Sequence, residues 1–166
     1  MNDMYAEARV KVKMTPTSLL LRGLMILGML VAFFVLPVIH SVFMIVSAGI
    51  VVVLIYMFPR LNVEYEYVFV DGQFDFDKIS GGSKRKTVLR IDMEKIEMIA
   101  PVNSHALDEF RNKKLVTKDF SSLQKSDKLY AIIAHGEKEL LRIVFEPSAE
   151  MITCMKNKSP RKVATM

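Results

Sequence analysis

The chain has 166 residues, of which 51% are hydrophobic, and its single cysteine excludes an intrachain disulfide and a Cys-rich metal site. It carries 23 lysines and arginines against 18 aspartates and glutamates, a formal net charge of +5. This modest excess is spread along the chain, so the composition does not indicate a nucleic-acid partner.

An almost continuous apolar stretch runs from Leu19 to Phe58, with Pro37 near its middle. A helix needs roughly 20 apolar residues to cross about 30 Å of hydrocarbon, and segments 19–36 and 38–58 both approach that length. The stretch therefore predicts two transmembrane helices folded as a hairpin. A cleaved signal peptide and a re-entrant hairpin are the alternatives. Arg22 lies in the first turn, where its side chain can reach the headgroups.

Basic residues flank this stretch on one side of the predicted membrane. The loop around Pro37 has none, whereas the two outer flanks carry Arg9, Lys11, Lys13, Arg22 and Arg60. Because basic residues favour the cytoplasmic side, both termini are expected in the cytoplasm, with the hairpin in the cell (inner) membrane.

Small residues lie where two closely packed helices would need them. Reflecting the sequence about Pro37 brings Gly28 to the depth of Ser47 and Ala48. Gly28, Ala32, Ser47 and Ala48 are therefore predicted to pack within the hairpin. Gly28 and Ala32 also form a small-xxx-small pair, which could instead serve a homo-oligomer.

The remaining chain is predicted to be one cytoplasmic domain, residues 59–166, separate from a short cytoplasmic segment, residues 1–17, and the hairpin, residues 18–58. Residues 63–70 alternate apolar and acidic side chains, and the tight turn Asp71-Gly72 leads into a second alternating run, residues 73–79. Ser80-Gly81-Gly82-Ser83 turns the chain again into residues 87–91. These patterns predict three antiparallel strands.

Weaker strand patterns and one helix follow. Residues 104–112 favour a short helix or an ordered loop. After Pro147, the spacing of Met151, Ile152 and Met155 predicts an amphipathic helix. The further predicted strands are residues 96–100, 115–120, 129–134 and 139–145.

About seven short antiparallel strands followed by one helix resemble the pleckstrin-homology-like barrel, in which a C-terminal helix closes one end of two sheets. The implied class is α+β: an N-terminal transmembrane helical hairpin plus a mainly antiparallel β barrel with a C-terminal capping helix. The whole chain resembles small bacterial membrane proteins that join paired spans to such a domain, most clearly in EYEYVFVDGQFDFDKI. A five-stranded OB barrel is the rival fold, and it would lack the terminal helix.

Basic residues gather around the glycine-rich turn. They resemble the basic hairpin with which eukaryotic pleckstrin-homology domains hold phosphoinositides, although that hairpin joins the first two strands and this turn joins the second and third predicted ones. Contact with anionic lipid or a protein partner is the functional interpretation, and an ordinary solvated turn is the alternative. The candidate residues are Lys78, Lys84, Arg85, Lys86 and Arg90.

Catalytic and metal-binding motifs are not found. His40, His105 and His135 belong to no known motif, and a grouping such as Ser104-His105-Asp108 is common by chance. Asp71, Asp75 and Asp77 are candidate metal carboxylates, but Asp75 and Asp77 alternate with phenylalanines and belong to the predicted exposed face of a strand, whereas an octahedral metal site would need a loop. Neither a cofactor nor enzyme activity is expected.

The sequence thus predicts a non-enzymatic membrane-anchored binding or scaffold protein. Its partners would be the lipid bilayer and an unidentified protein, with a homo-oligomer also open. The alternative is an accessory subunit of a membrane transporter or envelope-maintenance complex, in which the spans make the specific contacts. An enzyme with a pocket near His105 is a third reading.

Overall fold

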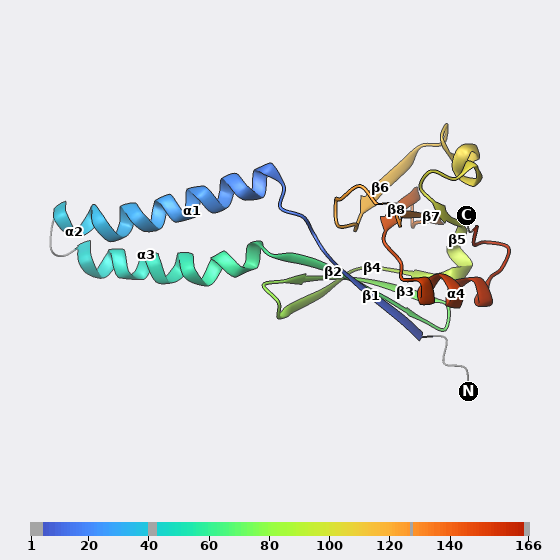
Figure 1. Ribbon diagram of the computed structural model, residues 1–166, viewed down its shortest axis with the longest axis horizontal. Coiled ribbons are helices and arrows are strands. Elements are labelled where there is room, and N and C mark those ends of the chain that lie inside the picture. Colours follow the sequence, from blue (N-terminus) through green and yellow to red (C-terminus); the bar gives the residue numbers. More distant parts are fainter. Residues whose placement is uncertain (1–4, 40–42, 127, 165–166) are drawn as a thin grey trace. The chain divides into compact units, whose positions relative to one another are not determined.

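A computed structural model describes residues 5–39, 43–126 and 128–164. These residues form two compact units (Figure 1). One unit is the helical hairpin, residues 13–63 together with the turn 80–84. The other is a β domain built from the rest of the described chain, including the N-terminal strand. Each unit has its own architecture.

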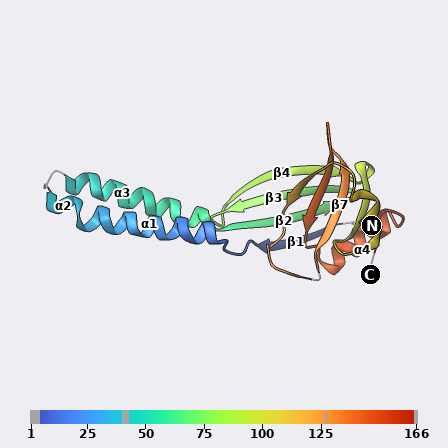
Figure 2. The same cartoon turned by 90° about the horizontal axis from the view of Figure 1, so that it is seen from above.

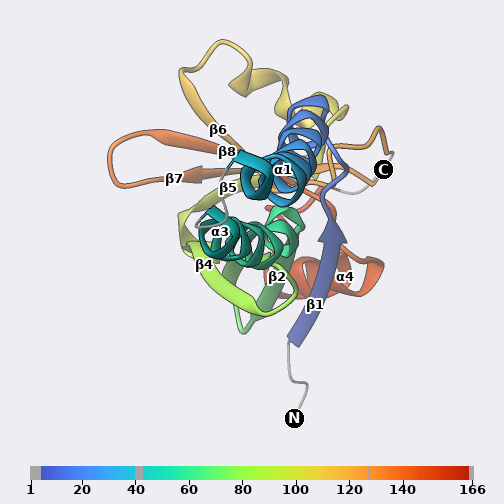
Figure 3. The same cartoon turned by 90° about the vertical axis from the view of Figure 1, so that its left-hand side faces the viewer.

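The helical hairpin consists of two long helices that lie side by side (Figures 1 and 3). Thr15 caps the first by accepting a hydrogen bond from the Ser18 amide at 3.3 Å. Both helices are long and apolar enough to cross a membrane when the short final 3₁₀ turn is counted with the second. The elements are α1 (Pro16–Phe34), α2 (Leu36–Ile39), α3 (Phe43–Met57) and η1 (Phe58–Leu61).

The first sheet of the β domain contains four strands in the order β1-β2-β3-β4 (Figure 2). The predicted turn between β2 and β3 is confirmed: Asp71 and Gly72 both have positive φ, 46° and 95°. Gly81 and Gly82 also have positive φ, 64° and 75°, at the turn into β4. The strands are β1 (Tyr5–Lys11), β2 (Val63–Val70), β3 (Gln73–Ser80) and β4 (Lys84–Asp92).

Strand β1 is the main difference from the sequence-based organisation, which set residues 1–17 apart from the domain. It pairs antiparallel with β2, with Ala6 opposite Phe69. Its sequence does alternate small apolar residues with charged ones, but its partner lies more than 50 residues away, beyond both helices. The alternation over seven residues is a weak signal by itself, and the distant partner that gives it meaning is not visible in the local sequence.

The second sheet has the order β5-β7-β8-β6. The predicted hairpin of β7 and β8 is confirmed. Strand β6 lies at the sheet edge, as expected, but it runs parallel to β8, so the expectation of antiparallel strands was wrong for this pair. A parallel neighbour needs a crossover connection, which β7 and the loops around it supply here. The strands are β5 (Ile96–Pro101), β6 (Leu115–Asp119), β7 (Tyr130–His135) and β8 (Leu140–Phe145).

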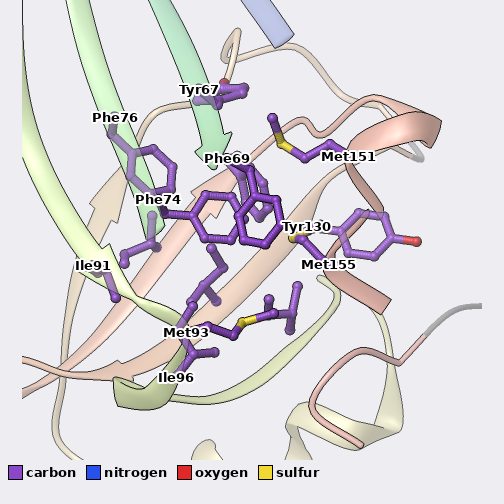
Figure 4. Close-up of a cluster of buried hydrophobic side chains, with 14 of the residues drawn as sticks. Tyr67, Phe69, Phe74, Phe76, Ile91, Met93, Ile96, Tyr130, Met151 and Met155 are labelled. Atoms are coloured by element: carbon purple, nitrogen blue, oxygen red, sulfur yellow. The ribbon is translucent and has the colours of Figure 1, made fainter. Parts of the chain in front are cut away.

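The main core lies between the two sheets and is rich in aromatic rings (Figure 4). The rings of Tyr67 and Phe145 meet edge to face, with centroids 5.6 Å apart, and Phe74 and Phe76 stack beside them. The predicted C-terminal helix is α4 (Ala149–Lys158), and its Met151 and Met155 are fully buried in this core. The α+β class with a C-terminal capping helix is therefore confirmed.

Contacts at the C-terminal end of α4 and just after it attach this part of the chain to both sheets. Lys158 reaches Asp71 at the β2–β3 turn, with Nζ and Oδ1 2.7 Å apart, and this ion pair holds the pKa of Asp71 below its ordinary value. After the helix, the chain pairs with the edge of β5: the amide of Ile99 donates to the carbonyl of Lys162, and the amide of Ala164 donates to the carbonyl of Ile99. Figure 3 shows α4 beside β1.

Candidate lipid- and partner-binding surface

The five basic residues predicted to form one surface divide into two groups. Arg85 and Arg90 are held by carboxylates of the first sheet. Arg90 forms a bidentate pair with Asp75, with both hydrogen bonds at 2.6 Å, and this contact raises its pKa. Arg85 pairs with Glu66 and lies 3.7 Å from Asp77. These two arginines neutralise acidic strand residues and are not available as free cations.

The three lysines remain available. Lys84 and Lys86 are exposed and Lys78 is partly buried. In the part of the chain that the structure describes, none of the three has an ion pair or a side-chain hydrogen bond. The surface that could contact an anionic partner is therefore smaller than the sequence predicted, and we define the basic turn as Lys78, Lys84 and Lys86.

Two acidic residues on this face of the first sheet are more buried than the alternating strand pattern predicts. Asp77 was predicted to be exposed, but its relative exposure is 6%, and that of Glu66 is 7%. Arg85 contacts both, and Arg9 of β1 lies 3.3 Å from Glu66. The long arginine side chains cover the carboxylates. The alternation therefore predicts correctly on which face of the sheet the acidic residues lie, but it does not predict that arginines bury them.

The glycine-rich turn is connected to the end of the second long helix. The amide of Gly81 donates to the carbonyl of Asn62 at 3.0 Å. Arg22, near the start of α1, donates to the side chain of Asn62 at 2.7 Å, and the guanidinium of Arg60 lies 4.3 Å from the centre of the Tyr56 ring. The helix ends and the turn thus bring Arg22, Arg60 and Lys84 into the same compact unit.

The predicted packing residues of the helices are only partly brought together. Ala32 and Ser47 are buried, whereas Ala48 is exposed. Gly28 lies against Leu54, with 3.7 Å between a Cβ built on the glycine and the leucine Cδ1, and not at the depth of Ser47 and Ala48. The shift arises because Pro37 lies within α2, so the chain reverses between α2 and α3 and not at the proline.

Ser104, His105 and Asp108, the residues considered for catalysis, do not form a connected hydrogen-bond chain among the described residues. They lie at the start of η3 (His105–Phe110), where Ser104 accepts a hydrogen bond from the amide of Ala106. His105 lies 3.0 Å from Asp108 and lowers its pKa. Among the described residues, no hydrogen bond joins Ser104 to His105, and no cluster of three potential metal ligands occurs. His135 pairs with Glu97, and His40 lies outside the described residues.

The fold and the comparison with protein families agree. The model of the bacterial PH-like domain family, DUF6106, matches residues 2–165. The chain belongs to this family. The pleckstrin-homology-like resemblance expected from the strand order is thereby confirmed, and domains of this kind are generally non-catalytic. No curated protein and no solved structure matches the chain.

Within the PH-like domain, β1 is an additional first strand, so each predicted strand is numbered one higher in the structure. The basic turn joins β3 and β4, and the connection between β1 and β2 consists of the helical hairpin. The lipid-binding hairpin of eukaryotic pleckstrin-homology domains joins the first two strands. In this chain, two apolar helices occupy that connection.

Proposed function

We propose that the protein is a membrane-anchored binding module. Its two apolar helices cross the cell membrane as a hairpin, and its PH-like domain faces the cytoplasm, where it contacts the inner leaflet and a protein partner. The observation that carries this proposal is the pairing of β1 with β2 across the helical hairpin.

This pairing constrains the membrane topology. Strand β1 precedes the first helix and β2 follows the second, and their ladder extends from Tyr5–Val70 to Lys11–Glu64. Two strands can pair only on the same side of a membrane, so the helices between them cross an even number of times. Cleavage after α1 would also remove β1 from its sheet, which argues against a signal peptide.

The lysines of the basic turn provide the contact with lipid. The turn 80–84 is hydrogen-bonded to Asn62, which directly follows the second candidate span. In a membrane, this bond holds Lys84 at the level of the headgroups, where each basic residue contributes on the order of 1 kcal/mol of attraction to anionic lipid. A tethered domain also meets its partner at a raised effective concentration, so a weak contact suffices.

Cysteine labelling tests the topology. In a Cys154→Ser background, a cysteine replacing Lys84 should react with a membrane-impermeant maleimide only after spheroplasts are permeabilised. A cysteine replacing Val38, which lies on α2 between the spans and is 84% exposed, is the matched control and should react in intact spheroplasts. Labelling of the Lys84→Cys variant in intact spheroplasts would exclude a cytoplasmic domain.

A further inference from the structure

A cavity of about 470 Å³ lies on the face of the second sheet that points away from the main core. It is bounded by the segment of η3, drawn in yellow in Figure 1, and by strands β6, β7 and β8. Its volume falls within the range of small-ligand sites. We call it the η3 pocket, and its apolar lining consists of Val102, Leu107, Phe110, Leu115 and Ile133.

A single arginine of β8 lies within this lining. Arg142 is paired in register with Ile133 of β7 on one side and with Thr117 of β6 on the other. Its Nε is buried and has no hydrogen-bond partner, and the described residues offer its side chain no ion pair. A buried donor on a charged group is costly when it lacks an acceptor. Arg142 is therefore a cation of the pocket lining that has no partner among the described residues.

The other charged groups of the η3 pocket do not compensate for Arg142. Asp108 is the carboxylate in the lining, and it is already shared by two partners. His105 lies 3.0 Å from one of its oxygens and Arg111 lies 3.5 Å from the other. The pocket thus holds two arginines and one engaged carboxylate, and its polar rim is completed by Asn103 and Ser104.

We propose that the η3 pocket binds an organic carboxylate whose aliphatic part lies on Leu107, Phe110 and Leu115. The planar fork of an arginine matches a carboxylate, and Arg142 lines the pocket without an ion pair among the described residues. The apolar lining would accommodate an aliphatic group of a few carbons. Asp108 opposes a doubly charged phosphate, and this favours a monoanion. The site goes beyond the proposed contact with lipid because it uses none of the residues of the basic turn.

Two sources of such a carboxylate are distinguishable: a free small acid and the carboxyl terminus of a peptide. Isothermal titration of the full-length chain in a non-ionic detergent should detect binding of 4-methylpentanoate or of acetyl-glycyl-leucine, and of neither corresponding amide. Tighter binding of the small acid identifies a metabolite-like ligand, and tighter binding of the dipeptide identifies a peptide terminus. Either result supports the carboxylate site.

Substitution of the arginine tests the mechanism. Arg142→Gln should weaken the binding of the acid roughly 10- to 100-fold, the loss expected for a charge-assisted hydrogen bond. Arg161→Gln, an identical change at an exposed residue outside the pocket lining, should leave the affinity unchanged. Arg142→Met should bind the acid as weakly as Arg142→Gln does, and without ligand it should raise the unfolding temperature because it removes the buried Nε donor. In that variant, loss of binding is not loss of folding.

Several results would overturn the proposal. They are equal binding of acid and amide, unchanged affinity in Arg142→Gln, no binding of either acid at millimolar concentration, and tighter binding of inorganic phosphate than of the carboxylates. None of these measurements depends on the lysines of the basic turn, so failure of the carboxylate site and failure of the proposed lipid contact are separable.

Discussion

At Tyr67, one hydroxyl group joins the two sheets of the domain. The ring is completely buried among phenylalanines, and its hydroxyl donates to the carbonyl of Phe120, just after β6, at 2.5 Å. Tyr65, two residues earlier on the same face of β2, packs against the ring of Phe120 and makes no side-chain hydrogen bond among the described residues. The two tyrosines therefore offer a matched pair, one with a buried polar contact and one without.

Tyr67→Phe should lower the free energy of unfolding by about 1–3 kcal/mol, because the carbonyl of Phe120 is left buried without a donor. Tyr65→Phe should change it by less than about 0.5 kcal/mol. Thermal unfolding of the detergent-solubilised chain, followed by circular dichroism, measures both. Equal effects of the two substitutions would show that the hydroxyl of Tyr67 contributes nothing specific.

Tyr67 also makes the stability of the fold depend on pH in the alkaline range. Burial raises the pKa of Tyr67 far above its ordinary value of 10 and raises the pKa of Tyr65 and Tyr130 as well. The folded state disfavours ionised tyrosine, so its stability is complete below pH 10 and falls as the pH rises beyond that value, where the unfolded chain ionises first. In Tyr67→Phe the fall should be less steep, and an unchanged slope would contradict this origin.

At the scale of elements, the alternating residues of β1 form a strand because they pair with β2, which lies beyond both helices in the sequence. Its small inward residues, Ala6, Ala8 and Val10, cover the aromatic side chains of β2, and its outward Arg9 pairs with Glu66. The strand also lies between β2 and the helix α4, with the carbonyl of Tyr5 near the thiol of Cys154. A β domain without residues 5–11 would expose the edge of β2 and part of the aromatic core.

A soluble domain should therefore require β1. Residues 62–166 alone should aggregate or unfold at a much lower temperature than a chain in which residues 1–12 are joined to residues 62–166 by a short glycine-serine linker. A linker of about four residues suffices, because hairpin loops of two to five residues connect antiparallel neighbours. Gel filtration and thermal unfolding compare the two. Equal unfolding temperatures would show that β1 is dispensable.

At the scale of the whole molecule, the two apolar helices are inserted in the chain between β1 and β2 of the domain. Within the helical unit, the amide of Gly81 in the turn 80–84 donates to the carbonyl of Asn62. With Arg85 and Arg90 held in ion pairs, the proposed contact of the domain with lipid would depend on the lysines of the basic turn. Lipid binding and sheet stability should accordingly respond to different substitutions.

In the linker-joined β domain, Lys84→Glu with Lys86→Glu should lower the affinity for phosphatidylglycerol-containing vesicles, measured by co-sedimentation, by roughly 30-fold or more. The reason is that two basic contacts of about 1 kcal/mol each are lost. The effect should diminish at high salt. The double change Lys113→Glu with Lys114→Glu alters the net charge equally at another site and is the control. An equal loss in the control would indicate a general charge effect and not a specific surface.

Local sequence patterns were enough to predict the apolar helices, the two β hairpins, the amphipathic helix and the family resemblance, because each of these depends on residues that are neighbours in the chain. The pairing of β1, the parallel direction of β6, the burial of Asp77 and the unpaired state of Arg142 became evident in the folded chain alone. Those features depend on contacts between residues far apart in sequence, and burial or charge compensation exists only after such contacts form.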